Sequence, residues 1–236
     1  MIIDPNTFNA DDPRTWPLKI RIIANDVARS NDRSTAVIGG ICPFTFGGSR
    51  LLGVQQFLEL PLGLYGSELA NTLMKIDQTY NHNCLIVPDL SRDPTYGETL
   101  YDTFGRRVVG IQIVRSGEGK TYEVRRVRNG AVLVYNVGRT YLLELLLAEL
   151  RDERIRFAQS AESVRACEQL MALEPEQHES AMVYKCPPGG HDDLAMSLAM
   201  LVWAARHLHF DSWAQPIFDA HRPRPKRNQA RWGAFT

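Results

Sequence analysis

Apolar and polar residues alternate along the first ninety positions in a pattern typical of strands followed by a helix. The pattern predicts three strands, at residues 19–26, 35–41 and 51–60. The segments between them are short and rich in Asn, Asp, Gly and Ser, which favours an antiparallel meander. Apolar side chains then repeat at spacings of four, three and four and predict an amphipathic helix over residues 67–80. The continuous apolar run at 84–87 predicts a strand that is buried on both faces.

The second half of the chain mixes strands with helices. A short helix over 99–104 leads into a strand at 108–114, and this strand–helix–strand order predicts a parallel crossover. Two further strands flank Asn129-Gly130, a strong signal for a tight hairpin. The remaining pattern predicts a helix at 139–151, a strand at 154–158, and helices at 163–173 and 192–207.

These elements predict an α/β fold, in which helices flank a mixed β-sheet built from an antiparallel meander and parallel crossover strands. The first strand and the strand at 84–87 can be neighbours, with their C-terminal ends meeting where open α/β sheets bind ligands. We expect a polar N-terminal lead-in at 1–17, one domain at 18–210 and a basic C-terminal tail at 211–236.

Composition narrows the class of protein further. The 236 residues are 44% hydrophobic and 23% charged, which are ordinary globular values. No apolar run is long enough to span a membrane, and the N-terminus lacks the pattern of a signal peptide. The four cysteines form no C-x-x-C pair. This spacing argues against a zinc ribbon or a disulfide framework and fits a reducing cytoplasm.

Basic residues are unevenly distributed although the net charge is zero, with 27 basic against 27 acidic residues. Residues 106–128 contain seven basic and two acidic side chains, and residues 222–231 contain five basic ones and no acid. Such runs are either solvated faces or surfaces that follow a phosphate backbone.

Acidic residues occupy three positions where they could bind a metal ion or take part in catalysis. Asp26 ends the first strand, Asp89 follows the run at 84–87, and Asp192-Asp193 opens the last helix. Each could be a turn former or a helix cap. If all converge on one sheet edge, however, their repulsion requires a cation or protonation. Oxygen ligands without a His or Cys set point to Mg²⁺ or Mn²⁺, and two such ions support attack on a phosphodiester.

Two segments resemble motifs of a known family. Residues 25–35 resemble the Asp-x-Ala…Gly-Asp-x-Thr opening of the nuclease domain of viral terminase large subunits, and residues 190–199 resemble its closing His-Asp-Asp-Leu motif. Residues 85–89 and 110–113 lie where that domain has its middle acid and the following strand. The resemblance spans residues 18–210. It implies a ribonuclease H-like fold and metal-dependent cutting of double-stranded phage DNA during genome packaging.

The resemblance also implies roles for individual residues. Asp26, Asp89 and Asp193 would be the catalytic metal ligands, holding two Mg²⁺ or Mn²⁺ ions. Asp192 would be an auxiliary ligand or the helix cap, and sequence alone does not rank it against Asp193. Asp32 and His191 would contact these ligands and orient them without binding the metal ions themselves.

One departure from the family affects the middle acid. The turn after Asp89 reads Leu90-Ser91-Arg92-Asp93-Pro94, where the family has a Gly-rich, Thr-containing turn. Asp93 is therefore an alternative to Asp89, and a catalytically inactive DNA-binding or assembly module of the same fold is an alternative function. A resolvase-like nuclease acting on branched DNA is a further one.

DNA contacts are expected from the hairpin that follows the fifth strand, through Arg125, Arg126 and Arg128. The segment 116–121 lacks the first glycine of a P-loop, so we expect no packaging ATPase in this chain. The resemblance implies a separate packaging ATPase, the terminase small subunit and the portal protein as partners, in the cytoplasm of an infected or lysogenic bacterial host.

Overall fold

The computed structural model describes residue 9 and residues 11–18, 20–28, 33–46, 49–178 and 181–208. The strands are β1 Arg21–Asp26, β2 Thr35–Phe46, β3 Ser49–Glu59, β4 Cys84–Pro88, β5 Val109–Val114, β6 Glu118–Val127, β7 Gly130–Gly138, β8 Ile155–Phe157, β9 Glu174–His178 and β10 Ala181–Lys185. The helices are η1 Pro13–Thr15, α1 Gly66–Thr79, α2 Tyr96–Phe104, η2 Gly105–Arg107, α3 Arg139–Arg151, α4 Ala161–Met171 and α5 Asp193–His207. The predicted tail at 211–236 lies outside the described residues.

The central sheet has the strand order β4-β1-β2-β3-β8. Its β1, β2 and β3 are antiparallel, which confirms the predicted meander, and β4 lies parallel to β1. A smaller sheet, β5-β7-β6, continues beside β4 through parallel bridges between Ile86 and Val108 and between Asp89 and Ile111. The predicted crossover from β4 through α2 to β5 is therefore confirmed, and the fold is mixed α/β.

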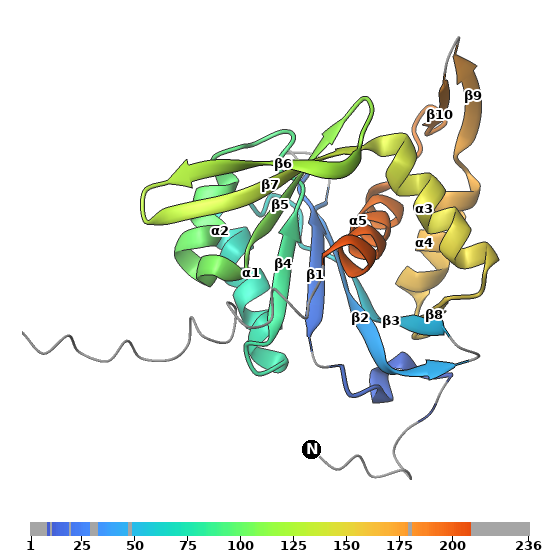
Figure 1. The fold of residues 1–236 in the computed structure, drawn as a ribbon, viewed down its shortest axis with the longest axis horizontal. Coiled ribbons are helices and arrows are strands. Elements are labelled where there is room, and N and C mark those ends of the chain that lie inside the picture. The colour runs from blue at the N-terminus through green and yellow to red at the C-terminus, as the bar shows by residue number, and fades with distance from the viewer. Residues whose placement is uncertain are drawn as a thin grey trace, which may run out of the picture.

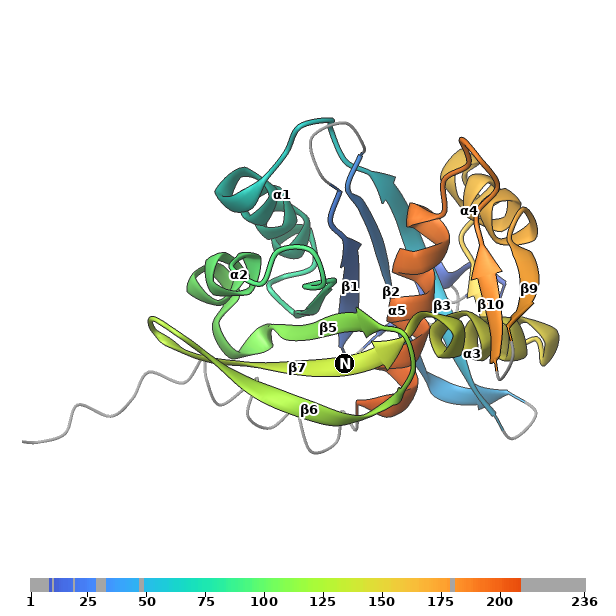
Figure 2. The same ribbon diagram turned by 90° about the horizontal axis from the view of Figure 1, so that it is seen from above.

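Helices cover both faces of the central sheet (Figure 1). α1 and α2 bury Leu69, Leu73 and Leu100 against one face, while α3, α4 and α5 pack on the other. α5 lies between the sheet and the two helices outside it, as Figure 2 shows. Its residues 194–205 are consequently all buried, rather than only the single face that the sequence pattern indicated.

A buried ion pair fixes the junction between α1 and β4. The Asp77 side chain is fully buried, and its Oδ2 lies 2.8 Å from Nη1 of Arg107. Asp77 Oδ1 also accepts a hydrogen bond from the Cys84 backbone N–H at 3.1 Å. The charges of both side chains are therefore compensated inside the protein, where either one alone would be costly.

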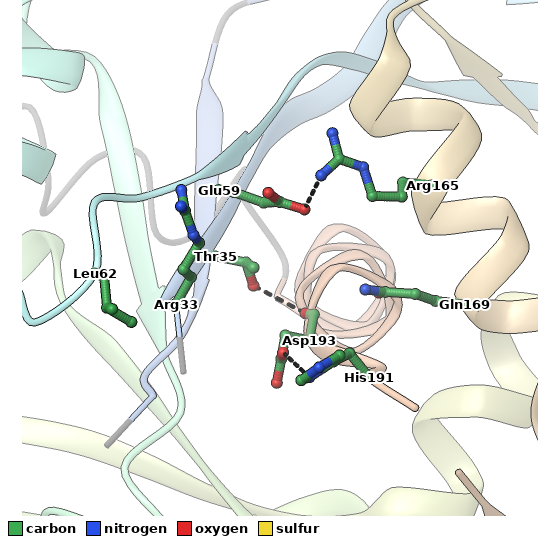
Figure 3. A pocket seen from close by; sticks show the side chains of 8 residues that line it. All are labelled: Arg33, Thr35, Glu59, Leu62, Arg165, Gln169, His191 and Asp193. Atoms are coloured by element: carbon green, nitrogen blue, oxygen red, sulfur yellow. Dashed lines mark hydrogen bonds and ion pairs between the residues drawn. The ribbon is translucent and has the colours of Figure 1, made fainter. Parts of the chain in front are cut away.

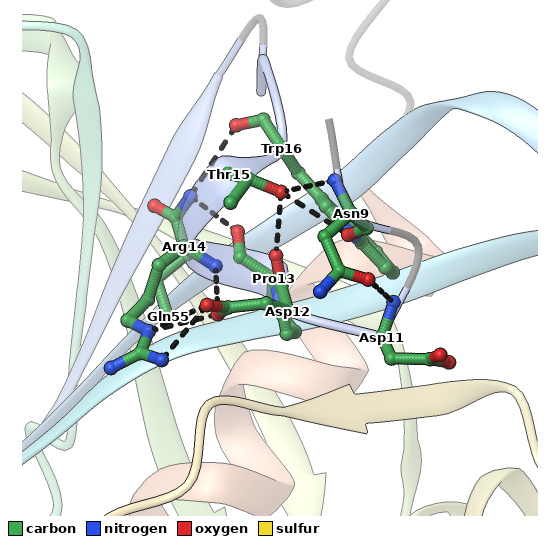
Figure 4. Close-up of polar contacts among 8 residues, drawn as sticks. All are labelled: Asn9, Asp11, Asp12, Pro13, Arg14, Thr15, Trp16 and Gln55. Carbon is green, nitrogen blue, oxygen red and sulfur yellow. Dashed lines mark hydrogen bonds and ion pairs between the residues drawn. The ribbon is translucent and has the colours of Figure 1, made fainter. Parts of the chain in front are cut away.

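The polar segment before β1 packs against the sheet, which its composition did not indicate. Trp16 is 1% exposed and covers Gly53 of β3, where a Cβ atom would lie 2.5 Å from the indole ring. Gln55 of β3 donates a hydrogen bond of 2.9 Å to the Pro13 carbonyl oxygen (Figure 4). A single buried tryptophan in a polar segment produces no periodic signal, so the pattern did not indicate this contact.

A hairpin of β9 and β10 was not predicted. The sequence of β9, Glu-Pro-Glu-Gln-His, contains no residue of high strand propensity. Among the described residues, no helix is long and apolar enough to cross a membrane.

Candidate active site

The ends of β1 and β4 bring Asp26 and Asp89 to the same edge of the sheet. The two strands are parallel, and the Asp89 backbone N–H donates to the Asn25 carbonyl oxygen at 2.9 Å. Ala24 and Val87, two residues before each acid, both pack in the core cluster that contains α5. Because side chains alternate along a strand, Asp26 and Asp89 point to this same face.

The first turn of α5 brings Asp193 to this edge. Thr35, the register partner of Asp26 on β2, donates from its hydroxyl to the Asp193 carbonyl oxygen at 2.9 Å. Ser197, one turn further along α5, lies 2.7 Å from the Thr35 hydroxyl and accepts a hydrogen bond from the Asp26 backbone N–H at 3.1 Å. The start of α5 is thereby fixed to β1 and β2.

Burial and neighbouring charge both disfavour ionisation of Asp26. Burial, followed by the negative charges of Asp89, Asp193 and Asp192, raises the pKa of Asp26 to about 8. The positive charge of Arg92 opposes these effects. The pKa of Asp89 is also raised, chiefly by burial, while hydrogen bonds from Ser91 and the charge of Arg92 oppose the increase. The acids predicted from the sequence are therefore close enough for the charges of three of them to affect the ionisation of Asp26.

The turn after β4 distinguishes Asp89 from Asp93. Asp89 Oδ1 accepts hydrogen bonds from the backbone N–H and the hydroxyl of Ser91, and the Ser91 hydroxyl accepts one of 2.6 Å from the Ile113 N–H of β5. Asp93 instead accepts from the Thr95 N–H and hydroxyl at 2.9 and 2.6 Å, at the start of α2. These contacts favour Asp89 over Asp93 as the middle acid.

Asp192 occupies the N-cap position of α5, and its carbonyl oxygen accepts from the Met196 N–H at 2.8 Å, but its side chain makes no capping hydrogen bond. Its carboxylate pairs with Arg139 at the start of α3. The free N–H groups of Leu194 and Ala195 donate instead to Gln169 Oε1 of α4, at 2.9 and 3.2 Å. Sequence reasoning missed Arg139 and Gln169, because neither is close in sequence to a motif.

The other two predicted supporting residues have different outcomes. His191 lies beside the site, with its Nδ1 3.8 Å from Oδ2 of Asp193. Asp32 lies outside the described residues. Arg92, which the sequence analysis gave no role, is an exposed side chain whose charge acts on both Asp26 and Asp89.

The predicted DNA-contacting arginines lie on the β6–β7 hairpin. Arg125 is engaged within the protein, because its guanidinium contacts Glu123 at 2.5 Å and Gln112 at 2.9 Å. Arg126 and Arg128 are exposed. Two arginines of the predicted set are therefore open to solvent, whereas Arg125 already has partners.

The hairpin tip lies away from the carboxylates. Asp89 is level with Ile111, Tyr135 and Tyr122 across the neighbouring strands. The three arginines lie three to six residues further along β6 from Tyr122, which is about 10–20 Å at strand spacing. Figure 2 shows the tip on the side of α2, and the Asn129 side chain donates to Asp102 of that helix at 2.6 Å. The tip of the hairpin is therefore displaced along the strand from the level of the carboxylates.

A pocket of about 400 Å³ adjoins the carboxylates on the side away from the β6–β7 hairpin, toward β3 and α4 (Figure 3). Asp193 and Thr35 line it together with residues from β3, α4 and the loops beside them. It is lined by Arg33, Thr35, Glu59, Leu62, Arg165, Gln169, His191 and Asp193.

The donor set fits a hard divalent cation. Asp26, Asp89, Asp193 and Asp192 offer carboxylate oxygens, which Mg²⁺ and Mn²⁺ prefer. The pKa of Asp26 is raised chiefly by burial and also by the neighbouring acids, and a cation would neutralise the negative charge of these acids. Within the part of the chain that the structure describes, no three His, Cys, Asp or Glu side chains are already gathered at ligating distance.

Comparison with known proteins identifies the fold. No protein-family model and no curated protein matches the sequence. The structure is similar to the large terminase nuclease of thermophilic phage G20c, with a TM-score of 0.52 and 17% identity over 77% of this chain and 80% of that one. It is also similar to the nuclease domain of the large terminase subunit gp2 of bacterial virus Sf6, with a TM-score of 0.54 and 13% identity over 79% of this chain and 90% of that one. The chain therefore has the ribonuclease H-like fold of large terminase nuclease domains.

Proposed function

We propose that this protein is a metal-dependent endonuclease that cuts double-stranded DNA during phage genome packaging. The observation that carries the proposal is the convergence of Asp26, Asp89 and Asp193 from β1, β4 and α5 at one sheet edge. Their arrangement in a fold shared with two large terminase nucleases supports nuclease chemistry over a solely structural use of these acids.

Asp26, Asp89 and Asp193 would hold two Mg²⁺ or Mn²⁺ ions, with Asp192 as an auxiliary ligand. When bound, such ions activate a water molecule and stabilise the leaving oxygen of the phosphodiester. Ser91 orients the Asp89 carboxylate, and Ser197 holds the backbone that carries Asp26. Because the pKa of Asp26 is raised to about 8, its carboxyl group favours the protonated form at neutral pH, and a cation held by these acids would favour its ionised form.

Arg92 supplies positive charge next to the acids. Its guanidinium is exposed at the turn that follows Asp89 and acts electrostatically on both Asp89 and Asp26. A phosphate group that approaches the carboxylates would meet a concentration of negative charge there, and the positive charge of Arg92 would reduce the repulsion as the substrate arrives.

The double-stranded substrate and the packaging context are what the resemblance of residues 25–35 and 190–199 to viral terminase large subunits implies. A packaging ATPase on a separate chain, the terminase small subunit and the portal protein would be the partners in that role. The cytoplasm of a phage-infected or lysogenic bacterium would be the place of action.

Cleavage of supercoiled plasmid tests the proposal. We expect nicking and linearisation with Mg²⁺ or Mn²⁺, none with EDTA, and binding without turnover in Ca²⁺, whose looser coordination positions water poorly. Asp26→Asn should abolish cutting. Asp11→Asn, a substitution of an exposed acid outside the site, is the matched control. Cutting that survives thorough metal removal, or that Asp26→Asn leaves intact, contradicts the proposal, and faster cutting of a four-way junction than of plasmid would favour a resolvase.

A further inference from the structure

The pocket beside Asp193 continues the row of strand ends that carries the candidate acids. Along this edge, Asp89, Asp26, Thr35 and Glu59 come from the neighbouring strands β4, β1, β2 and β3. Glu59 is thus two strands from Asp26, a Cα separation of about 10 Å at normal strand spacing. A group bound in the pocket would lie directly beside a group bound at the carboxylates.

The polar lining of the pocket includes one cation that is available to a ligand. Arg165 is paired with Glu59 at 2.7 Å and lies 3.8 Å from Glu162. Arg33 is exposed and forms no ion pair with any residue that the structure describes. Its guanidinium can therefore bind an anionic group such as a phosphate without breaking an ion pair to the described part of the chain.

The apolar part of the lining is small and lies at the rim. Leu62 is 57% exposed and contributes to the pocket from the loop after β3. The volume of about 400 Å³ falls in the range of sites for small organic ligands. A deoxynucleotide combines the two features that this lining can recognise, a phosphate for Arg33 and an apolar sugar or base face for Leu62.

The hairpin arginines are less well placed than Arg33 to hold the substrate at the carboxylates. The hairpin arginines lie about 10–20 Å further along β6 from the level of Asp89, as strand spacing requires. Among them, Arg125 already donates hydrogen bonds to Glu123 and Gln112. Contacts that position the strand at the reacting phosphate must therefore come from residues nearer the carboxylates.

We propose that this pocket holds the nucleotide adjacent to the scissile phosphate on the strand being cut, with Arg33 binding its phosphate and Leu62 contacting its sugar or base. The proposal rests on the proposed nuclease function and adds to it a substrate-positioning site. Arg33 holds the strand and takes no part in the metal site.

Fluorescence anisotropy with a labelled 20-nucleotide single strand and the matching duplex, in Ca²⁺, tests the pocket without cleavage. We expect Arg33→Ala to weaken binding about five- to tenfold. The slope of log affinity against log salt should fall by about 0.7 for the single strand and about 0.9 for the duplex. Arg33→Lys should restore part of the loss, because the charge remains while the planar fork is lost.

Lys75→Ala is the matched control, since it removes one exposed positive charge from α1 on the other face of the sheet. It should leave affinity and salt slope unchanged. In cleavage assays Arg33→Ala should raise KM while kcat stays within about twofold, as expected for loss of a binding contact. Thermal melting should show Arg33→Ala and wild type unfolding together, because the Arg33 side chain is exposed.

The outcomes separate the two proposals. If the wild type cuts DNA and Arg33→Ala behaves like Lys75→Ala, the pocket assignment is overturned while the nuclease function stands. If no metal supports cutting but Arg33→Ala still weakens binding selectively, the nuclease function fails and the pocket remains a nucleic-acid site. Absence of any DNA binding by the wild type overturns both.

Discussion

Replacing Asp26 with asparagine should stabilise the metal-free protein. The pKa of this carboxyl group is raised to about 8, first by burial and then by Asp89, Asp193 and Asp192. In the unfolded chain the pKa of the same group is about 3.9. Between these values the folded state binds more protons than the unfolded state, so the free energy of unfolding falls as pH rises. Asparagine has nearly the same shape but no charge, and it removes this cost.

The magnitude follows from the difference in pKa. At pH 7 the folded group is still largely protonated, and the penalty approaches about 1.36 kcal/mol for each unit between 3.9 and 7, or about 4 kcal/mol. Relaxation of the neighbouring acids reduces this ceiling, so we expect a gain of about 1–4 kcal/mol for Asp26→Asn. In a chain of this length each kcal/mol corresponds to about 2–4 °C in Tm.

Urea and thermal unfolding in EDTA, from pH 4 to pH 8.5, measure the effect. The advantage of Asp26→Asn should be near zero at pH 4, grow steadily to pH 8 and then level off, while Asp11→Asn shows no such trend. Added Mn²⁺ should stabilise the wild type more than the variant, since binding to the folded state raises the free energy of unfolding. A variant that is less stable than wild type at pH 8, or a difference independent of pH, would refute the electrostatic reasoning.

Three further substitutions test separate parts of the structure. Asp89→Asn should reduce plasmid cleavage by about a hundredfold or more, because a metal ligand is lost, whereas Asp93→Asn should stay within a few fold; the opposite order would assign the middle ligand to Asp93. Arg107→Met should lower the free energy of unfolding in urea by about 3–5 kcal/mol, since Asp77 remains buried without its partner; a loss below 1 kcal/mol would show that the pair is not needed. Trp16→Ala should cost about 3–5 kcal/mol for the buried ring, and unchanged urea unfolding would mean that the N-terminal segment does not pack on β3 in solution.

Periodicity predicted the elements that build the sheet, because β1 to β4 combine strand-forming residues with clear turn signals. It also predicted that Asp26 and Asp89 lie at one edge of the sheet, since they stand at the C-terminal ends of strands that are parallel neighbours. It could not locate Gln169 or Arg139, whose importance depends on α4 and α3 meeting the start of α5. The distance of the basic hairpin from the acids could not be predicted either, because composition indicates charge, whereas strand register decides how far that charge lies from the site.

The hydrogen bonds around the acids hold the Asp89 carboxylate differently from Asp26 and Asp193. Asp26 and Asp193 belong to segments joined through Ser197 and Thr35, so their relative position is set by the packed interior itself. The backbone at Asp89 is also held, by its own N–H on the Asn25 carbonyl oxygen and by the Leu90 N–H on the Ile111 carbonyl oxygen of β5. The Asp89 carboxylate itself is oriented by Ser91 of the turn, whose hydroxyl accepts from the Ile113 N–H. Sequence change in the turn can therefore re-aim one carboxylate while the other two stay in place. This difference allows the spacing of a metal pair to be adjusted through a surface turn, without rebuilding the core.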